Sequence, residues 1–312
     1  MINIKMHIPV LLKKSIKSLK IKKNGIYIDT TFGFGGHSKE ILKKINNYGK
    51  LYSIDRDPFS IKIAKKIKDK RFKIIHGLFS NIKKYCKKYN ILKKVNGIIM
   101  DLGMSSMQLN NKNRGFSYKK NGPLDMRMNQ KNGISASEWL IKTKEKKLSY
   151  ILKKYGEERY HKKIAFNIIK NMKKKPIKKT CQLSKIILNS TPYYKISSAK
   201  KTFQAIRIKI NNELKELKKF LKKVLNVLAP KGRLSIISFH SLEDRIVKKF
   251  MFNYSRKFPN LPSSIPLTEK ELKKINQKKK KIKIFKKIIP DKKEILKNYR
   301  SRSAILRTLK LK

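Results

Sequence analysis

Four short apolar runs alternate with helical patterns in the first third of the chain, and this alternation constrains the fold more than any other feature. We expect strands at 25–29, 50–55, 72–76 and 95–101, and helices at 37–46, 58–69 and 80–90. Strands separated by helices are typical of βαβ units and a parallel sheet. The sequence therefore predicts an α/β domain.

Three of these apolar runs end in an acid, namely Asp29, Asp55 and Asp101. The carboxyl ends of parallel strands meet at one edge of an open α/β sheet, and ligands bind at that edge. We therefore expect the three carboxylates to point into one crevice.

The pattern changes after Leu102. Residues 103–133 are polar and rich in turn formers, and 134–195 have the spacing of short helices without strands. A helix at 212–228 and strands at 232–239 and 303–309 are expected to follow. We interpret the chain as a discontinuous α/β domain of residues 1–110 and 201–312, interrupted by an inserted helical domain of residues 111–200.

A lysine-rich segment of low complexity occupies residues 262–298. Segments of this composition bury too little apolar surface to fold by themselves. We expect it to be a mobile excursion on the surface.

The charge of the chain is extreme, with 82 basic and 19 acidic residues and a formal net charge of +63. Such a surface attracts RNA, DNA or anionic membranes. Only 12 of the basic residues are Arg, however, and Ile and Asn are abundant, which is typical of a genome biased toward A and T codons. The charge therefore permits nucleic-acid binding without demonstrating it.

Cysteine usage and hydropathy exclude several classes. Cys86 and Cys181 share no CxxC spacing and have no histidine nearby, so we expect neither a disulfide framework nor a metal site. No apolar run approaches the length of a membrane span. We expect a soluble, cytoplasmic protein without metal or membrane partners.

The first expected strand leads into a glycine-dense turn, DTTFGFGGHSKEIL at 29–42, which is typical of a nucleotide-like ligand site. A dinucleotide fingerprint wants Gly or Ala where this chain has Ser38, although Asp55 stands where the ribose acid is expected. A P-loop is excluded because no GK[ST] follows the glycines.

S-adenosylmethionine fits this turn better. It has no pyrophosphate, so the missing third glycine costs nothing, whereas a glycine turn and a ribose acid are still needed. An adenine-side turn, HGLFS at 76–80, and the MDLG strand end at 100–103 follow in the expected order. The alternative is a structural β-turn-α without a ligand.

Many blocks of the chain resemble the RsmH (MraW) family. The matching blocks are HIPVLL (7–12), DTTFGFGGHS (29–38), IDRDP (54–58), DLGMSSMQL (101–109), RGFS (114–117), GPLDMRM (122–128), EWL (138–140), YGEERY (155–160), TFQAIRI (202–208), LAPKGRLSIISFHSLEDRIVK (228–248) and RSRSAILR (300–307). They cover nearly the whole chain in order. Phe34, Met107 and Asn110 depart from the family pattern of Arg, Pro and Asp.

The resemblance implies a Rossmann-like methyltransferase domain with an inserted helical domain that helps to recognise substrate. It also implies S-adenosylmethionine as cofactor and methylation of the exocyclic N4 of a cytidine in the decoding region of 16S ribosomal RNA, on RNA or within the small subunit. The implied cofactor contacts are Gly35, Gly36, His37, Asp55, Phe79, Asp101 and Gln108. In this scheme Asp55 holds the ribose, Phe79 lies beside the adenine, and the last two lie near the methionine end.

The chemistry points to Asp101 as the catalytic residue. The N4 lone pair of cytosine is delocalised into the ring, so a carboxylate that accepts the N4–H bonds would localise it and take the proton. The alternative is that Asp101 serves only the ammonium of the cofactor, and the two roles are compatible. Attack at carbon 5 instead needs a cysteine nucleophile, and neither cysteine follows an expected strand.

Other motifs have two interpretations. The segment 114–127 interleaves aromatic and basic residues, which predicts either a grip on single-stranded RNA or a lid over the cofactor. His240 and Ser241 follow an expected strand and either line the substrate pocket or cap a helix. We expect Trp139 in the core of the insertion, with Ser135 or Ser137 as a helix cap.

Three other functions remain as alternatives to an RNA methyltransferase. The main one is a non-catalytic RNA-binding factor in ribosome assembly with a degenerate methyltransferase fold, which the intact glycines and acids disfavour. Ser38 disfavours a nicotinamide oxidoreductase. A DNA methyltransferase would show an [SDN]PP[YFW] motif where this chain has DLGM.

Overall fold

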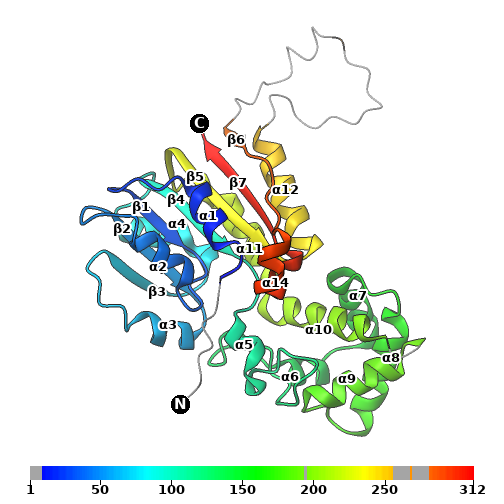
Figure 1. The fold of residues 1–312 in the computed structure, drawn as a ribbon. Helices are drawn as coiled ribbons and strands as arrows, with labels where there is room; N and C mark the ends of the chain where they lie inside the picture. The colour runs from blue at the N-terminus through cyan, green and yellow to red at the C-terminus, as the bar shows by residue number, and fades with distance from the viewer. Residues whose placement is uncertain (1–8, 193–194, 256–267, 269–280) are drawn as a thin grey trace. The chain divides into compact units, whose positions relative to one another are not determined.

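The computed structural model describes residues 9–192, 195–255, 268 and 281–312. The described residues fall into two compact units (Figure 1). The sheet unit comprises residues 1–103 and 216–312, and the helical unit comprises residues 104–215. Each is described by itself below.

The sheet unit is built on seven strands in the order β3-β2-β1-β4-β5-β7-β6. The strands are β1 (Ile26–Asp29), β2 (Lys50–Asp55), β3 (Phe72–His76), β4 (Val95–Asp101), β5 (Leu228–Ser238), β6 (Ile282–Ile284) and β7 (Ile305–Leu311). The first five are parallel, and β7 pairs antiparallel with both β5 and β6. The direction of the strand order reverses between β1 and β4, which makes this the topological switch point of a Rossmann-like α/β fold. The predicted fold class and the four early strands are confirmed.

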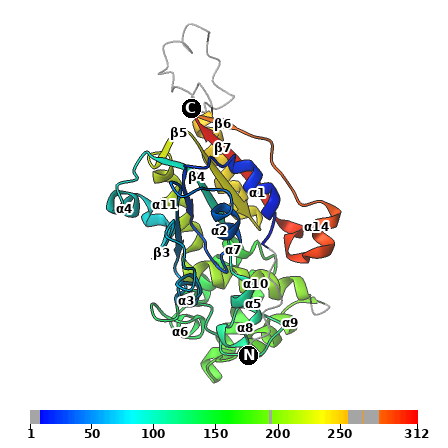
Figure 2. The ribbon, with the colours of Figure 1, turned by 60° about the vertical axis from the view of Figure 1, so that its left-hand side comes forward.

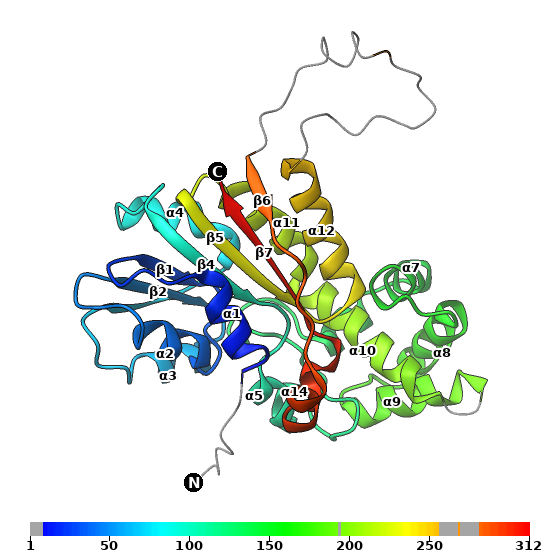
Figure 3. The same cartoon turned by 45° about the horizontal axis from the view of Figure 1, so that its top comes forward.

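Helices cover both faces of the sheet, as Figures 2 and 3 show. On one face lie α1 (Leu12–Leu19), α2 (Gly36–Leu42) and α3 (Pro58–Ala64), and on the other lie α4 (Ile82–Lys88), α11 (Glu213–Val224) and α12 (Ser241–Ser255). The 3₁₀ turns η1 (Phe79–Asn81) and η4 (Tyr299–Ser303) and the helix α14 (Lys292–Lys297) complete the unit.

Side-chain alternation in the strands produces the two hydrophobic cores. In β4, Ile98 and Met100 are buried against the α4, α11 and α12 side, whereas Ile99 is buried against the α1 and α2 side. Strand side chains alternate with a period of two, so a continuous apolar run supplies both faces. This is the reason that the early strands could be predicted from apolar runs.

The later elements differ from the prediction in their bounds. The helix predicted at 212–228 ends at Val224, and β5 begins at Leu228, four residues before the predicted start at 232. The additional residues of β5 continue the β4–β5 ladder across a register shift between Val95 and Gly97.

The segment predicted to be a mobile excursion is partly structured. Residues 262–267 and 269–280 lie outside the described residues. Residues 281–298, in contrast, contain β6 and α14, so the prediction is wrong there. Pairing with β7 and burial of Ile282 organise this lysine-rich sequence, because tertiary contacts supply what its composition lacks.

The helical unit contains α5 (Ser106–Asn110), η2 (Lys112–Arg114), α6 (Ala136–Ile141), α7 (Glu145–Gly156), α8 (His161–Lys174), α9 (Thr180–Asn189) and α10 (Ile196–Asn211). Trp139 is buried in its core, and Ser135 caps α6 in a capping box with Glu138, as predicted. Within this unit α10 packs on α7, where a Cβ at Gly156 would lie 2.8 Å from the Lys201 carbonyl oxygen. The helical unit, residues 104–215, thus extends beyond the predicted bounds of 111–200 at both ends.

Candidate active site

The three acids lie at the carboxyl ends of adjacent strands of the sheet unit. Asp55 ends β2, Asp29 ends β1 and Asp101 ends β4. In their strands they have the same parity as Leu51, Tyr27 and Ile99, which belong to the core on the α1 and α2 side. The three side chains therefore point to one face at the switch point, and we call this place the acid edge.

Asp29 is the innermost of the three, with 1% of its surface exposed. Its Oδ2 accepts a 2.6 Å hydrogen bond from Ser38 Oγ, and its Oδ1 accepts a 3.1 Å bond from the Thr31 backbone N–H. Burial raises the pKa of Asp29 to about 6, and the charge of Asp55 adds to this rise. The structure thus holds a carboxylate where desolvation opposes ionisation.

Asp55, at the end of β2, hydrogen-bonds the backbone of the glycine turn. Its Oδ2 accepts from the Gly33 backbone N–H and its Oδ1 from the Asp57 backbone N–H, both at 2.8 Å. Burial raises the pKa of Asp55 in spite of these two bonds and of a third from the Ser60 side chain. Each carboxylate oxygen has a second lone pair, so Asp55 can still accept from a hydroxyl group such as that of a ribose.

Asp101 completes the acid edge. Its backbone N–H donates to Thr31 Oγ1 at 2.7 Å, and its buried Oδ1 accepts no hydrogen bond from the described residues. Burial raises the pKa of Asp101 well above its ordinary value, and the charges of Asp29 and Glu243 act in the same direction. An unsatisfied buried carboxylate oxygen is costly, and its presence at the carboxyl end of a central strand indicates a ligand site.

The glycine turn approaches this edge through its backbone. Gly35 has a φ of 75° and is the N-cap residue of α2, and a Cβ there would lie 2.6 Å from the Phe32 ring. A Cβ at Gly36 would overlap the Pro9 ring. His37 follows in the first turn of α2 and is buried. Only glycine fits the first two positions, which brings main-chain groups close to the acids.

Phe79 lies in the η1 turn after β3, as expected for a residue at the same sheet edge. Its ring meets Phe220 of α11 edge-on, with 5.8 Å between centroids. The neighbouring Ser80 donates to the buried carboxylate of Glu216 and accepts at its carbonyl from Lys223 Nζ at 2.9 Å. Three contacts from α11 therefore hold the turn that presents Phe79.

Gln108 belongs to the helical unit. It is buried and its Oε1 accepts from the Ser105 backbone N–H at 3.0 Å, while Ser105 Oγ accepts from the Gln108 backbone N–H at 3.3 Å. This capping box fixes the start of α5. A contact between Gln108 and the cofactor stays a prediction.

The acid edge suits a cation. In the part of the chain that the structure describes, none of the three acids forms an ion pair with Lys or Arg. That part also contains no group of three or more His, Cys, Asp and Glu side chains that could hold a metal ion. Desolvated carboxylates without a basic partner fit the sulfonium and ammonium charges of S-adenosylmethionine, because a positive ligand restores the ionised forms.

Sequence reasoning missed the residues that support this edge. Ser38, noted only as a departure from the dinucleotide fingerprint, bonds Asp29 and shares a 2.8 Å hydrogen bond with Ser53. Thr31 links Asp29 to the backbone of Asp101. The sequence signal that could have identified them is the presence of Ser and Thr residues shortly after an acid that ends a strand.

His240 caps a helix. Its Nδ1 accepts from the Glu243 backbone N–H at 3.4 Å, and Glu243 Oε2 accepts from the Phe239 backbone N–H at 2.9 Å. Glu243 and Asp244 occupy the first turn of α12, where the helix dipole favours acids, as predicted. This geometry supports the capping interpretation, whereas Glu243 additionally carries its charge toward Asp101.

Of the two interpretations of the 114–127 segment, a grip on RNA does not hold for Arg114 and Phe116, because their side chains are buried. Arg114 and Phe116 are buried, with Arg114 donating to the carbonyl oxygens of Arg127 and Met128. Arg127 forms a two-pronged ion pair with Asp125. These side chains stabilise the helical unit from within.

The two cysteines have no catalytic setting in the described structure. Cys86 is buried in the core on α4, and burial raises its pKa to about 12. Cys181 is exposed on α9. A thiol that stays protonated is a poor nucleophile, so Cys86 does not support attack at carbon 5.

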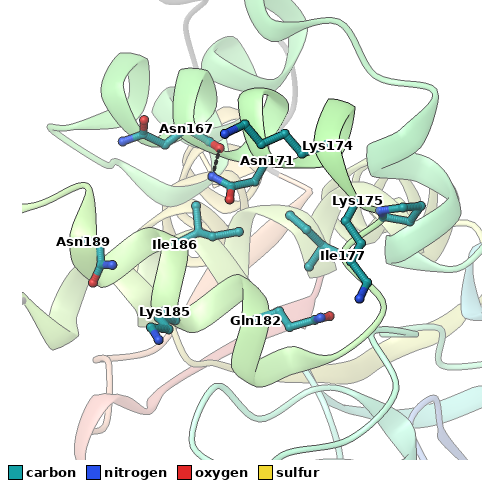
Figure 4. Close-up of a pocket in the computed structure, with 10 residues that line it drawn as sticks. Asn167, Asn171, Lys174, Lys175, Ile177, Gln182, Lys185, Ile186 and Asn189 are labelled. Atoms are coloured by element: carbon teal, nitrogen blue, oxygen red, sulfur yellow. Dashed lines mark hydrogen bonds between the residues drawn. The ribbon is translucent and has the colours of Figure 1, made fainter.

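A pocket of about 480 Å³ lies between α8 and α9 of the helical unit (Figure 4). Amide and lysine side chains line most of it: Asn167, Asn171, Lys174, Lys175, Gln182, Lys185 and Asn189. Its lining includes no Asp, Glu, His or Cys. The pocket thus offers hydrogen bonds and positive charge but no acid–base group.

In the described ranges, no helix is both long and apolar enough to span a lipid bilayer.

Comparisons with known proteins agree with this geometry. The model of the MraW methylase family matches residues 4–312. A relative from Buchnera aphidicola subsp. Baizongia pistaciae, called ribosomal RNA small subunit methyltransferase H, is 59% identical over 304 residues, covering 96% of each chain. Relatives with the same name from Buchnera aphidicola subsp. Schizaphis graminum and from Wigglesworthia glossinidia brevipalpis are 57% and 53% identical, covering 98% and 97% of each chain. The family model covers nearly the whole chain, and the chain belongs to the MraW methylase family.

Proposed function

We propose that this protein transfers a methyl group from S-adenosylmethionine to the exocyclic N4 of a cytidine in the decoding region of 16S ribosomal RNA. Membership of the methylase family and relatives called ribosomal RNA small subunit methyltransferase H support the reaction class and the substrate. The observation that carries the proposal is the acid edge, where three desolvated carboxylates stand without a Lys or Arg partner among the described residues. The proposed setting is the cytoplasm, on RNA or on the small subunit during its assembly.

The sheet unit supplies the proposed cofactor contacts. Asp55 accepts from the ribose hydroxyls, and Phe79 lies beside the adenine. The backbone of Gly35, Gly36 and the adjoining His37 approaches the nucleoside, because the φ of Gly35 and the packing of Gly36 on Pro9 leave no room for side chains there. Gln108 is the proposed contact from the helical unit, and that unit is proposed to help recognise the RNA.

Asp101 is the proposed catalytic residue. The bound cofactor supplies an electrophilic methyl group on a sulfonium. Asp101 accepts the N4–H bonds of the cytosine through the oxygen that makes no hydrogen bond among the described residues, and this localises the nitrogen lone pair. As the bond from N4 to the methyl carbon formed, the bond from that carbon to the sulfonium sulfur would break with its electron pair left on sulfur, and N4 would lose a proton to this carboxylate.

The raised pKa of Asp101 suits this role. A carboxylate with a raised pKa is a stronger base, but it must be ionised before it can accept a proton. A cation at the acid edge lowers the pKa values of the neighbouring acids and so favours the ionised form of Asp101 when the site is filled.

Mass mapping of small-subunit RNA after incubation with enzyme and cofactor tests the proposal. We expect one methyl group on the base of a cytidine at N4, which distinguishes this reaction from methylation at carbon 5 or on the ribose. Asp101→Asn should lower kcat by at least about 100-fold, since general-base catalysis contributes about 10² to 10⁴ in rate. Asp69→Asn, an acid before β3 at the opposite sheet edge, is the matched control and should leave kcat unchanged.

These measurements, together with calorimetry of cofactor binding, distinguish the alternatives. If Asp101→Asn weakens cofactor binding in calorimetry but leaves kcat intact, Asp101 serves only the ammonium. If the wild-type protein binds RNA and leaves it unmodified, the non-catalytic assembly factor is the better interpretation. Methylation at carbon 5 or on a ribose contradicts the proposed reaction.

A further inference from the structure

An exposed aromatic residue stacked with an arginine lies on the sheet unit in a motif that the proposed chemistry does not use. Tyr299 begins η4 and is 67% exposed, and the Arg302 guanidinium lies 5.0 Å from the centre of its ring. Leu296 of α14, one turn before, is 86% exposed. We call Leu296, Tyr299 and Arg302 the η4 platform.

The η4 platform lies at the same sheet edge as the three acids. Strand β7 is antiparallel to β5, so it starts where β5 ends, with Ile305 opposite Ser238. In the neighbouring pair, Ile237 of β5 is opposite Asp101 of β4. The turn that precedes β7 therefore sits at the edge where the reaction is proposed, and Figure 3 shows α14 beside that end of the sheet.

The segment before the platform is attached to the rest of the sheet unit. Leu11 N–H donates to Glu294 Oε1 at 2.5 Å, and Lys14 Nζ pairs with Asp291 Oδ2 at 2.9 Å. Ile288 forms a bridge with Leu306 of β7. Anchoring of the preceding segment reduces the conformational entropy that the platform would lose on binding.

Arginine is informative in this chain because only 12 of its 82 basic residues are Arg. Several of the described arginines make two-pronged bonds to carboxylates within the protein: Arg71 with Asp69, Arg127 with Asp125, Arg207 with Glu213, and Arg307 with Asp244. Arg302, in contrast, is exposed and stacks on an exposed ring. A codon bias toward Lys does not account for an Arg in this position, whereas a planar cation for an external ligand does.

We infer that the η4 platform binds a single-stranded RNA segment next to the target cytidine, with one base stacked on Tyr299 and a phosphate held by Arg302. This inference rests on the proposed function. Aromatic rings that stack bases beside cations that hold phosphates are the usual means of binding unpaired RNA. Lys292, Lys293 and Lys297 of α14 are exposed around the platform and add positive charge.

RNA is favoured over an anionic membrane surface by the stacked pair. A membrane-binding element needs a broad apolar face with cations at its rim. In the η4 platform the Arg302 guanidinium lies over an exposed Tyr299 ring, so a cation and an aromatic surface stand next to each other. This pair fits a phosphate and its neighbouring base rather than a lipid interior.

The test measures kcat and KM for the RNA with Tyr299→Ala, Tyr299→Phe and Arg302→Lys. Tyr299→Ala should raise the KM for RNA about tenfold, because stacking one base contributes about 1 to 3 kcal/mol. Tyr299→Phe should behave like the wild type, because stacking needs the ring and not the hydroxyl. Arg302→Lys should raise the KM through loss of the planar fork, and none of the three should change kcat or cofactor affinity.

Tyr48→Ala is the matched control, since Tyr48 is 79% exposed and precedes β2 at the opposite edge of the sheet. A KM for Tyr299→Ala within twofold of that of Tyr48→Ala, with the wild type methylating N4 normally, overturns this inference alone. Absence of methylation by the wild type overturns the proposed function and this inference together. An unchanged KM for RNA combined with weaker binding to phosphatidylglycerol vesicles assigns the platform to membranes and also overturns the inference.

Discussion

Replacing Asp29 by Asn tests the electrostatic account of the acid edge most directly. Asp29 is buried, and burial raises its pKa from 3.8 to about 6. At neutral pH the folded protein therefore holds an ionised carboxylate in a buried site, where desolvation disfavours the charged form. Asparagine keeps the shape and removes the charge.

The size of the effect follows from the pKa. A rise from 3.8 to about 6 corresponds to about 3 kcal/mol. Between these two values the unfolded chain has lost the proton and the folded chain has kept it, so the free energy of unfolding falls as the pH rises. Above about pH 6 both states are ionised and the full destabilisation is present.

Loss of a hydrogen bond offsets part of the stability that Asp29→Asn gains by removing the buried charge. Asp29 accepts from Ser38 Oγ and from the Thr31 N–H with different oxygens, whereas Asn has only one acceptor oxygen. Losing one such bond costs about 1 kcal/mol. We therefore expect Asp29→Asn to stabilise the protein by about 2 kcal/mol at pH 7 and to destabilise it by about 1 kcal/mol at pH 3.5.

Urea unfolding of the wild type and of Asp29→Asn at several pH values measures the pH at which their difference in free energy of unfolding changes sign. Asp69→Asn is the contrasting control, because its partner Arg71 lowers the pKa of Asp69. That variant should lose stability relative to the wild type as the pH rises. If the difference between Asp29→Asn and the wild type does not change with pH, the burial argument for the acid edge is refuted.

Three further predictions concern the same unit. Cofactor binding should release protons near pH 6, because a cation lowers the raised pKa values of the acids; calorimetric heats that do not depend on the buffer would contradict this. Gly36→Ala should weaken cofactor binding and lower the melting temperature, since the new Cβ overlaps the Pro9 ring; unchanged values of both would show that the turn adapts freely. A thiol reagent should label exposed Cys181 in the native protein and buried Cys86 only after unfolding, and Cys86→Ala should keep full methylation; loss of activity would revive carbon-5 chemistry.

Much of the sheet could be predicted because its signals are local. Apolar runs ending in Asp29, Asp55 and Asp101 gave both the strands and the edge at which they end. Parallel strands share their carboxyl edge whatever the loops do, so the order of elements along the chain was sufficient to place the acids at one edge. The sheet topology decided that β2, β1 and β4 are neighbours there.

Other features depended on contacts between distant residues. Ser38 serves the site through a hydrogen bond to Asp29, and Glu243 of α12 adds its charge near Asp101, although 142 positions of sequence numbering separate them. Arg114 and Phe116 suggested an RNA-binding surface but are buried. Aromatic and basic residues can occur together on an exposed RNA-binding surface and also in a buried polar network. Only the packing of the folded chain distinguishes the two.

The sequence by itself determined the alternation of strands and helices, the glycine turn and the three acids at strand ends, because periodicity and backbone freedom are properties of neighbouring residues. The tertiary structure alone decided how strongly those acids resist ionisation. Desolvation depends on what the whole fold places around a carboxylate, and only the fold leaves Asp101 without a hydrogen bond to Oδ1 from the described residues.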